Sequence, residues 1–256
     1  MKLTEENYYS TESDAAYLSY SQLKSFLACE AAAMYADREP PTTAMLTGSY
    51  VDAWFEGTLN KFQAENPQIF KKDGSLKADY QTAEKIIQRV QEDEMFMRYM
   101  SGEKQVIMTG EIAGAPYKIK MDSYHAGKAI VDLKCMRDMN YRWSDYTACK
   151  VPFVEAFGYD IQAAIYREIV RQNTGNTLPY FLAVATKEDP PDIALAGIPA
   201  EVLDEKLRFV EEITPHIQAV WEGQIPPHRC GVCAYCRRTK KITEILDYRE
   251  LGRYNQ

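Results

Sequence analysis

Two carboxylates and a lysine stand close together in the segment KIKMDSYHAGKAIVDLKC, residues 118–135. Asp122 is followed, after nine intervening residues, by Asp132 and Lys134 in the order Asp-Leu-Lys. Carboxylate and carbonyl oxygens are hard ligands that suit Mg²⁺ or Mn²⁺. We therefore expect Asp122, Asp132 and the carbonyl of Leu133 to hold one or two such ions. Lys134 would project its ammonium to the same side of a strand as Asp132.

The alternation of apolar and charged residues in this segment predicts a β-hairpin, because successive side chains of a strand point to opposite faces. A loop of three residues, 125–127, would pair Tyr124 with Lys128 and keep the apolar positions together on the core side. Asp122 would then lie across from Ile130, and all the charges would lie on the face away from the core. A solvated strand face would show the same pattern, but two neighbouring carboxylates repel each other unless a cation bridges them.

The elements that would position these groups are those of an α/β domain with a mixed sheet. Helices are predicted first, then three strands, a helix, two further strands and a long helix. The helical segments are 19–38, 42–62, 77–100, 154–175 and 200–223. The strands are 104–114, 115–125, 128–136, 178–188 and 191–199, with a loop at 137–152.

A single domain with a tail at each end is the expected organisation. The domain covers 19–241, divided into a helical part, a core and a C-terminal helix with a cysteine-rich segment, at 19–103, 104–200 and 201–241. The tails are 1–18, which is polar, and 242–256.

Length and composition bound the class of protein. The chain has 256 residues, a net charge of −7 and 46% hydrophobic residues, which indicates a globular protein with one sizeable core. No apolar run approaches membrane-spanning length, and the N-terminus lacks the apolar core of a signal peptide. We therefore expect a cytoplasmic protein without membrane contact. The acidic balance argues mildly against coating nucleic acid over the whole surface, but it leaves a local basic groove open.

Three residues of the helix predicted at 154–175 share one face. Tyr159, Gln162 and Tyr166 recur at i, i+3 and i+7. Periodicity alone favours a polar surface with half-buried tyrosines, and the opposite stripe of the helix is the apolar core side.

Cysteines form a second constellation with possible metal chemistry. Cys230, Cys233 and Cys236 have C-x-x-C-x-x-C spacing, and Cys29 is a candidate for the fourth ligand. Four thiolates suit Zn²⁺ or an iron–sulfur cluster. In a cytosolic protein such cysteines are more typical of metal ligands than of disulfides, and unligated thiols this close together would be prone to oxidation.

Together these motifs resemble the PD-(D/E)XK nuclease superfamily, and within it the RecB-like, exonuclease VIII-like group. The pattern Asp122…Asp132-Leu-Lys134 looks like the signature that gives the superfamily its name. The resemblance implies a restriction-endonuclease-like core in which the two acids hold the metals and the lysine assists the attacking water. Gln162-x-x-x-Tyr166 matches the Q-x-x-x-Y element on the following helix, which implies a role in positioning the scissile phosphate. Lys120 and Tyr159 are expected to contact substrate as well.

Two features depart from the group's pattern. An early helix there carries G-x-x-x-H, whereas Gly48 is followed here by Asp52. Aspartate is a harder ligand than imidazole, so Asp52 could hold the same cation with a different metal preference; an exposed helix carboxylate is the alternative. The cysteines resemble the iron–sulfur staple of AddB-type nucleases, in which the third late cysteine lies further along. Phage proteins with a short CxxCxxC tail look closer, which implies a [4Fe–4S] cluster with Zn²⁺ as the rival.

The resemblance implies a Mg²⁺- or Mn²⁺-dependent exodeoxyribonuclease of phage or prophage type, acting on linear DNA ends in recombination or repair. By family analogy its partner is a single-strand annealing protein, and a homo-oligomer is left open. A non-catalytic DNA-binding or assembly module with the same fold and cysteine clamp is one rival, which the exchange of histidine for Asp52 keeps open. A nuclease of the CRISPR-adaptation type is another.

Overall fold

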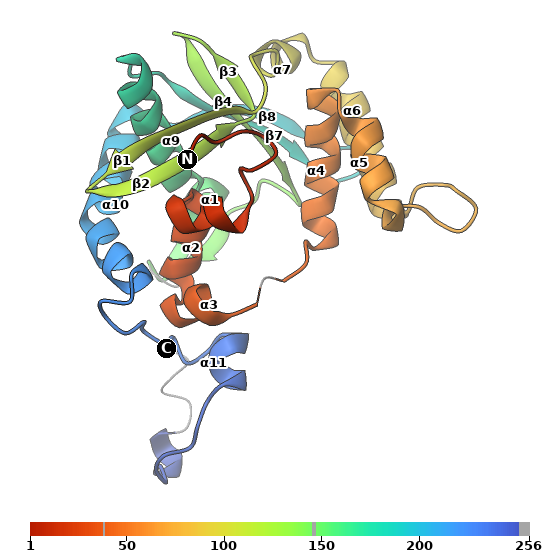
Figure 1. Cartoon of the computed structure of the whole chain (residues 1–256). Coiled ribbons are helices and arrows are strands. Elements are labelled where there is room, and N and C mark those ends of the chain that lie inside the picture. Colours follow the sequence, from red (N-terminus) through yellow and green to blue (C-terminus); the bar gives the residue numbers. More distant parts are fainter. Residues whose placement is uncertain (38, 145–146, 251–256) are drawn as a thin grey trace.

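A four-stranded sheet lies at the centre of the computed structural model, which describes residues 1–37, 39–144 and 147–250 (Figure 1). Its strands, in spatial order, are β3 (Ser123–His125), β4 (Ala129–Met136), β7 (Tyr180–Thr186) and β8 (Ile193–Gly197). β4 and β7 run parallel, whereas β3 and β8 are antiparallel to their neighbours. The sheet is therefore mixed, as the order of elements predicts.

Both faces of this sheet are covered, which explains why its two central strands are apolar nearly throughout. Val131 and Ala183 belong to a buried cluster with residues of α4 (Thr43–Glu56), α6 (Ala78–Gln91) and α7 (Glu94–Tyr99). Ile130 and Leu182 face the other way, into a cluster with residues of α9 (Tyr159–Thr174) and α10 (Ala200–Trp221). Because side chains alternate along β4, Asp132 lies on the same side as Ile130, toward α9.

The strand predicted at 115–125 is divided in two at Asp122. Its first part, β2 (Ala115–Met121), forms an antiparallel hairpin with β1 (Val106–Ile112), and its second part is β3 in the central sheet. The division has a local cause, because the carboxylate of Asp122 accepts the backbone N–H of Leu133 at 2.8 Å and takes the place of a ladder partner. The sequence pattern carries no sign of this exchange.

The predicted register of the second hairpin is wrong by one loop position. Tyr124 pairs with Ile130 rather than with Lys128. The turn is closed by the N–H of Lys128, which donates to the carbonyl of His125 at 2.8 Å, and Gly127 within it has a positive φ of 67°. The loop still has three residues, so each side chain stays on the predicted face of its strand, but the cross-strand partners shift by two.

The prediction that all the hairpin charges lie on the face away from the core is also wrong, because two of them are buried. Asp132 is 2% exposed and Lys118 is 1% exposed. Asp132 is contacted by Gln162 of α9. Lys118 is covered by the N-terminal segment, predicted as a polar tail, which contains α1 (Thr11–Ala16) and the buried side chains of Tyr8 and Leu18. This segment supplies the polar partners that Lys118 needs when it leaves water.

Several predicted helices are interrupted where the chain changes direction. The first divides at Cys29, whose backbone is extended, into α2 (Tyr20–Ala28) and α3 (Glu30–Tyr35). The second predicted helix is divided at Gly57, which has a positive φ of 74°, into α4 and α5 (Leu59–Glu65). Asp93 caps the start of α7 by accepting the N–H of Phe96. Gly158, also at positive φ, separates α8 (Phe153–Ala156) from α9.

The remaining elements are short. The expected loop at 137–152 contains a small hairpin, β5 (Arg142–Ser144) with β6 (Cys149–Val151). The others are η1 (Pro67–Ile69), α11 (Ala234–Arg238) and η2 (Tyr248–Glu250). Among the helices of the described ranges, none combines the length and the apolar character needed to cross a membrane.

Candidate functional site

A cleft of about 1230 Å³ brings together every residue that the sequence predicts at the nuclease site. Its walls come from the N-terminal segment, α2, α4, α5, β2, β4 and α9. The predicted residues that line it are Asp52, Asp122, Asp132, Leu133, Lys134, Lys120, Tyr159, Gln162 and Tyr166. They lie on elements up to 114 positions apart in the sequence, so the cleft is a product of the tertiary fold.

Asp132 is held from two sides at the centre of this group. The ammonium of Lys134 forms an ion pair with its Oδ2 atom, and Nε2 of Gln162 donates to its Oδ1 atom at 3.0 Å. Lys134 stands two residues along β4 and so lies on the same face, while Gln162 comes from the helix packed on that face. The carboxylate therefore has a fixed orientation in a nearly buried position.

Asp122 is fixed beside Asp132 by the main chain of β4. Its Oδ2 atom accepts the N–H of Leu133 at 2.8 Å. Burial raises the pKa of Asp122 to about 7, and the negative charge of Asp132 adds to this effect. The site therefore places a carboxylate where it is costly to ionise, and a bound cation would offset that cost.

Asp52 adds a third carboxylate from α4. Burial raises the pKa of its carboxyl well above the ordinary value, and the charge of Asp122 raises it further. Burial on its own would lower the pKa of Lys134, but the charges of Asp132 and Asp122 outweigh it and hold that pKa above its ordinary value. Three acids in one another's field thus lie near the partly buried ammonium of Lys134. Carboxylate oxygens are the type of ligand that a hard divalent ion prefers.

Aromatic rings and further lysines surround the acids. The Lys134 ammonium lies 4.7 Å from the ring centre of Tyr159. Tyr166, largely buried, packs edge-on against Tyr180 at 6.1 Å. Lys120 lies 4.7 Å from the ring centre of Tyr9. Tyr159 and Tyr166 thus line the same cleft as the acids, as the sequence predicts. Tyr9, in contrast, belongs to the segment that was predicted as a polar tail.

Several residues that line the cleft belong to the first 24 residues of the chain, where the sequence predicted no part of the site. Tyr8, Tyr9 and Lys24 line the cleft, although the first two were assigned to a tail. Lys24 on α2 donates to the carbonyl of Phe157 at 2.8 Å, which attaches this wall to the segment preceding α9. The available signal was a pair of adjacent tyrosines in an otherwise polar stretch.

The cleft as a whole is acidic. Seven carboxylates and five lysines line it. With all seven acids ionised, a phosphate backbone would meet net repulsion unless divalent cations at the clustered acids reversed the sign of the local charge. The raised pKa values of Asp52 and Asp122 reduce this repulsion when no cation is bound.

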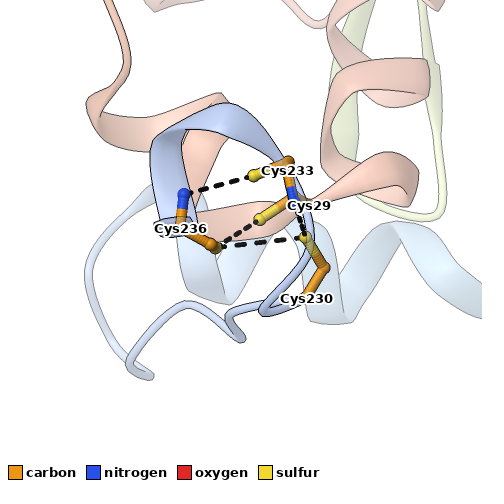
Figure 2. Close-up of side chains that lie close together, drawn as sticks. All are labelled: Cys29, Cys230, Cys233 and Cys236. Carbon is orange, nitrogen blue, oxygen red and sulfur yellow. Dashed lines mark hydrogen bonds between the residues drawn. The ribbon is translucent and has the colours of Figure 1, made fainter. Parts of the chain in front are cut away.

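The four predicted cysteines converge in one cluster (Figure 2) and are not among the residues that line this cleft. Their sulfur atoms all lie within 4.8 Å of one another, with 3.5 Å between Cys29 and Cys236 and 4.0 Å between Cys230 and Cys236. Cys29 is delivered by the break between α2 and α3, and the others come from the segment around α11. Backbone N–H groups, first that of Cys233, lower the pKa of Cys230 to about 6, which favours the thiolate form that metals bind.

The spacing of the sulfurs suits a single tetrahedral ion. With metal–sulfur bonds of about 2.3 Å, a tetrahedral ion holds its thiolates about 3.8 Å apart, close to the two distances given above. A cluster of four irons interposes its own iron atoms between the thiolates and holds them further apart. The convergence of the four cysteines is thus confirmed, and they can bind a metal.

Comparisons with known proteins agree with the fold. A family model described as a PDDEXK-like domain of unknown function, DUF3799, matches residues 19–239. A crystal structure from Eubacterium rectale described as a "putative exonuclease" is 46% identical over 98% of this chain and 98% of that chain, with a TM-score of 0.93. The structure of SSO0001 is 16% identical, with a TM-score of 0.32 over 88% of this chain and 96% of that chain, too distant to support an argument. No curated protein matches this sequence. The predicted superfamily and mixed α/β fold are confirmed, and the chain belongs to the family of PDDEXK-like domains.

Proposed function

We propose that this protein is a divalent-metal-dependent exodeoxyribonuclease that hydrolyses phosphodiester bonds at the ends of linear DNA. The observation that carries the proposal is the convergence of Asp122, Asp132 and Lys134 in one cleft, with both oxygens of Asp132 held in place. The family match and the likeness to the Eubacterium rectale protein support nuclease activity. The exonucleolytic mode and the metal requirement are the finer parts of the proposal.

Each residue of the site has a distinct part in this reaction. Asp122, Asp132 and the carbonyl of Leu133 would hold the ion, with Asp52 as a further carboxylate from α4. A bound divalent ion supplies an acidified water and offsets charge on the phosphate. Lys134 keeps its ammonium charged through its ion pair, so it can orient the attacking water and stabilise negative charge developing on the phosphate.

Gln162 acts on the geometry of the site. By donating to Asp132 it fixes the one carboxylate that also binds Lys134. Tyr166 and Tyr159 flank the same position on α9 and are proposed to contact the strand that carries the scissile phosphate. Metal dependence gains support from the seven carboxylates of the cleft, which oppose binding of a polyanion when they are ionised and no cation is present.

Digestion of end-labelled linear DNA and closed circular DNA of the same sequence, with Mg²⁺ and with EDTA, tests the proposal. We expect progressive loss of nucleotides from the linear substrate only, and only with Mg²⁺. Cleavage of the circle at a similar rate would show an endonuclease. DNA binding without hydrolysis in Mg²⁺ or Mn²⁺ would support the non-catalytic module instead. The phage setting and the annealing-protein partner rest on the resemblance alone.

For the cysteine site we propose a single structural Zn²⁺ in preference to the [4Fe–4S] cluster that the resemblance implies. The sulfur–sulfur distances of 3.5 and 4.0 Å support this choice. The site joins Cys29 at the start of the domain to Cys236 near its end, so its role is to hold these two parts of the chain together.

A further inference from the structure

The N-terminal strap, residues 1–18, is fixed against the body of the protein by a buried lysine. The ammonium of Lys118 donates to the carbonyl of Tyr8 at 2.7 Å and to Oγ of Ser13 at 2.8 Å, and it pairs with Asp14 at 2.5 Å. The strap continues alongside β2, where the N–H of Lys118 donates to the carbonyl of Leu18 at 2.8 Å. A buried charge with three partners anchors this segment firmly, since each lost partner would leave polar groups unpaired.

Two adjacent tyrosines of the strap lie in the catalytic cleft in different environments. Tyr8 is buried, whereas Tyr9 is 68% exposed although it lines the cleft. Their rings meet edge to face, 5.0 Å apart at 87°. The ammonium of Lys120 stands 4.7 Å from the ring centre of Tyr9 and 5.7 Å from that of Tyr8. Tyr9 is therefore braced by two neighbours while most of its surface faces solvent.

This arrangement has the chemistry of a platform for a nucleobase. Proteins that bind single strands combine aromatic rings, on which bases stack, with cations that follow the backbone. Tyr9 offers the ring, and Lys120 offers an ammonium with several donors beside it. Both line the same cleft as Asp122, so a base on this ring would belong to a strand whose phosphates reach the carboxylates.

We propose that the cleft takes an unpaired DNA end, with Tyr9 stacked on a base close to the scissile phosphate and Lys120 bound to an adjoining phosphate. The inference rests on the proposed function and specifies its substrate as a single strand. In a duplex both faces of an internal base are covered by its neighbours, so a base beyond the terminal pair can lie on the ring only when it is unpaired or extruded. Residues of the strap and of α4 and α5 also line this cleft.

Binding of fluorescent single-stranded and blunt duplex oligodeoxynucleotides, measured by anisotropy with Ca²⁺ in place of Mg²⁺, tests the inference. We expect wild type to bind the single strand more tightly, and Tyr9→Ala to weaken that binding by about 5- to 150-fold, the range of base–aromatic stacking. Tyr9→Phe should stay within about twofold of wild type, because it keeps the ring. Tyr35→Ala, which removes a tyrosine of 59% exposure outside the cleft lining, is the matched control and should change nothing.

A second measurement places the base. Single strands carrying one abasic site, moved along the end nucleotide by nucleotide, should weaken wild-type binding at one position by a factor similar to that of Tyr9→Ala. The same abasic strand should cost the Tyr9→Ala variant little, because the stacking partner is already absent. Equal losses in both proteins at every position would overturn the inference, as would unchanged single-strand binding by a folded Tyr9→Ala protein.

The outcomes separate this inference from the proposed function. If wild type digests linear DNA with Mg²⁺ while Tyr9→Ala binds and digests single strands normally, the platform is wrong and the nuclease assignment stands. If single strands bind through Tyr9 but hydrolysis never occurs in Mg²⁺ or Mn²⁺, the platform stands and the nuclease assignment is wrong.

Discussion

The side-chain amide of Gln162 donates to Oδ1 of Asp132 at 3.0 Å, and so a helix holds the carboxylate of a strand that lies 30 residues earlier. The other oxygen of Asp132 is paired with Lys134. The orientation of this acid is therefore set by two elements at once, and the position of α9 against the sheet becomes part of the geometry of the site.

Replacing Gln162 by alanine should reduce both stability and metal affinity. Periodicity placed Gln162 on an outward polar face, where loss of the side chain costs little, but the residue is buried. The substitution leaves a buried acceptor without its donor, a loss of about 1–3 kcal/mol. Chemical denaturation and calorimetric titration with Mn²⁺ measure the two effects. Gln88→Ala, at an exposed position on α6, is the control, and equal behaviour of the two variants would contradict the proposed role.

Removing Asp132 and removing Lys134 should have different consequences for metal binding. Asp132→Ala should abolish hydrolysis and weaken Mn²⁺ binding, because it deletes a proposed ligand. Lys134→Ala should lower the rate about a hundredfold or more without weakening Mn²⁺ binding, because it removes a competing cation from the acids. Lys128→Ala, at an exposed turn position, should behave as wild type. Digestion of linear DNA by Asp132→Ala at near the wild-type rate would remove the catalytic assignment.

The metal-free protein should lose stability as the pH rises from about 4 to about 7. Burial, with the Asp132 charge, raises the pKa of Asp122 to about 7 in the folded protein, well above the ordinary value of about 3.9. A carboxyl with a raised pKa in the folded state stabilises the fold at low pH, and this contribution disappears as the group ionises. Denaturation in EDTA at pH 5 and pH 8 measures the difference.

Two comparisons isolate the contribution of Asp122. Asp122→Asn should show a smaller pH dependence, since the amide cannot ionise and its oxygen can still accept the N–H of Leu133. Mg²⁺ should stabilise wild type more at pH 8 than at pH 5, because it binds the ionised acids. A metal-free protein that is more stable at pH 8 than at pH 5 would contradict the assigned direction of the pKa.

The cysteine site should contain one Zn²⁺ per chain in protein purified without oxygen. Cys29→Ser should remove the metal and loosen both the α2–α3 junction and the α11 segment, which hydrogen–deuterium exchange can follow. Cys149→Ser, at an exposed cysteine outside the cluster, is the control. Brown protein with broad absorbance near about 400 nm would establish an iron–sulfur cluster instead.

Local patterns in the sequence predicted which residues form the site better than they predicted which parts of the chain bury those residues. The alternation along β4 correctly put Asp132 and Lys134 on one face, because that relationship depends on two residues of the same strand. The burial of Lys118 could not be read in this way. Its partners Tyr8 and Asp14 lie 110 and 104 residues away, and a lysine in an alternating strand normally indicates solvent.

The prediction of one continuous helix through Cys29 failed for a related reason. The residue is surrounded by good helix formers in FLACEAAAM, so propensity favours one continuous helix. The fold instead extends the backbone there and brings the thiol 3.5 Å from that of Cys236, which is 207 residues away. A tertiary requirement overrides local preference, and a linear pattern contains no trace of it. The register of the hairpin formed by β3 and β4 was missed because a loop at 125–127 and a loop at 126–128 place the side chains of both strands on the same faces. The alternation of apolar and charged residues therefore cannot distinguish the two loops.

The link between Cys29 and Cys236 also imposes an order of events during translation. A ribosome makes α2, with the cleft residues Tyr20 and Lys24, long before it makes the cysteine that closes the clamp beneath that helix. At 5–20 residues per second the interval is roughly 10–40 s. A nascent chain halted before Cys236 therefore holds α2 through its packing and through the bonds of Tyr20 and Lys24 to the carbonyl of Phe157, without the clamp. Prematurely terminated products would lack this additional link between the two parts of the chain.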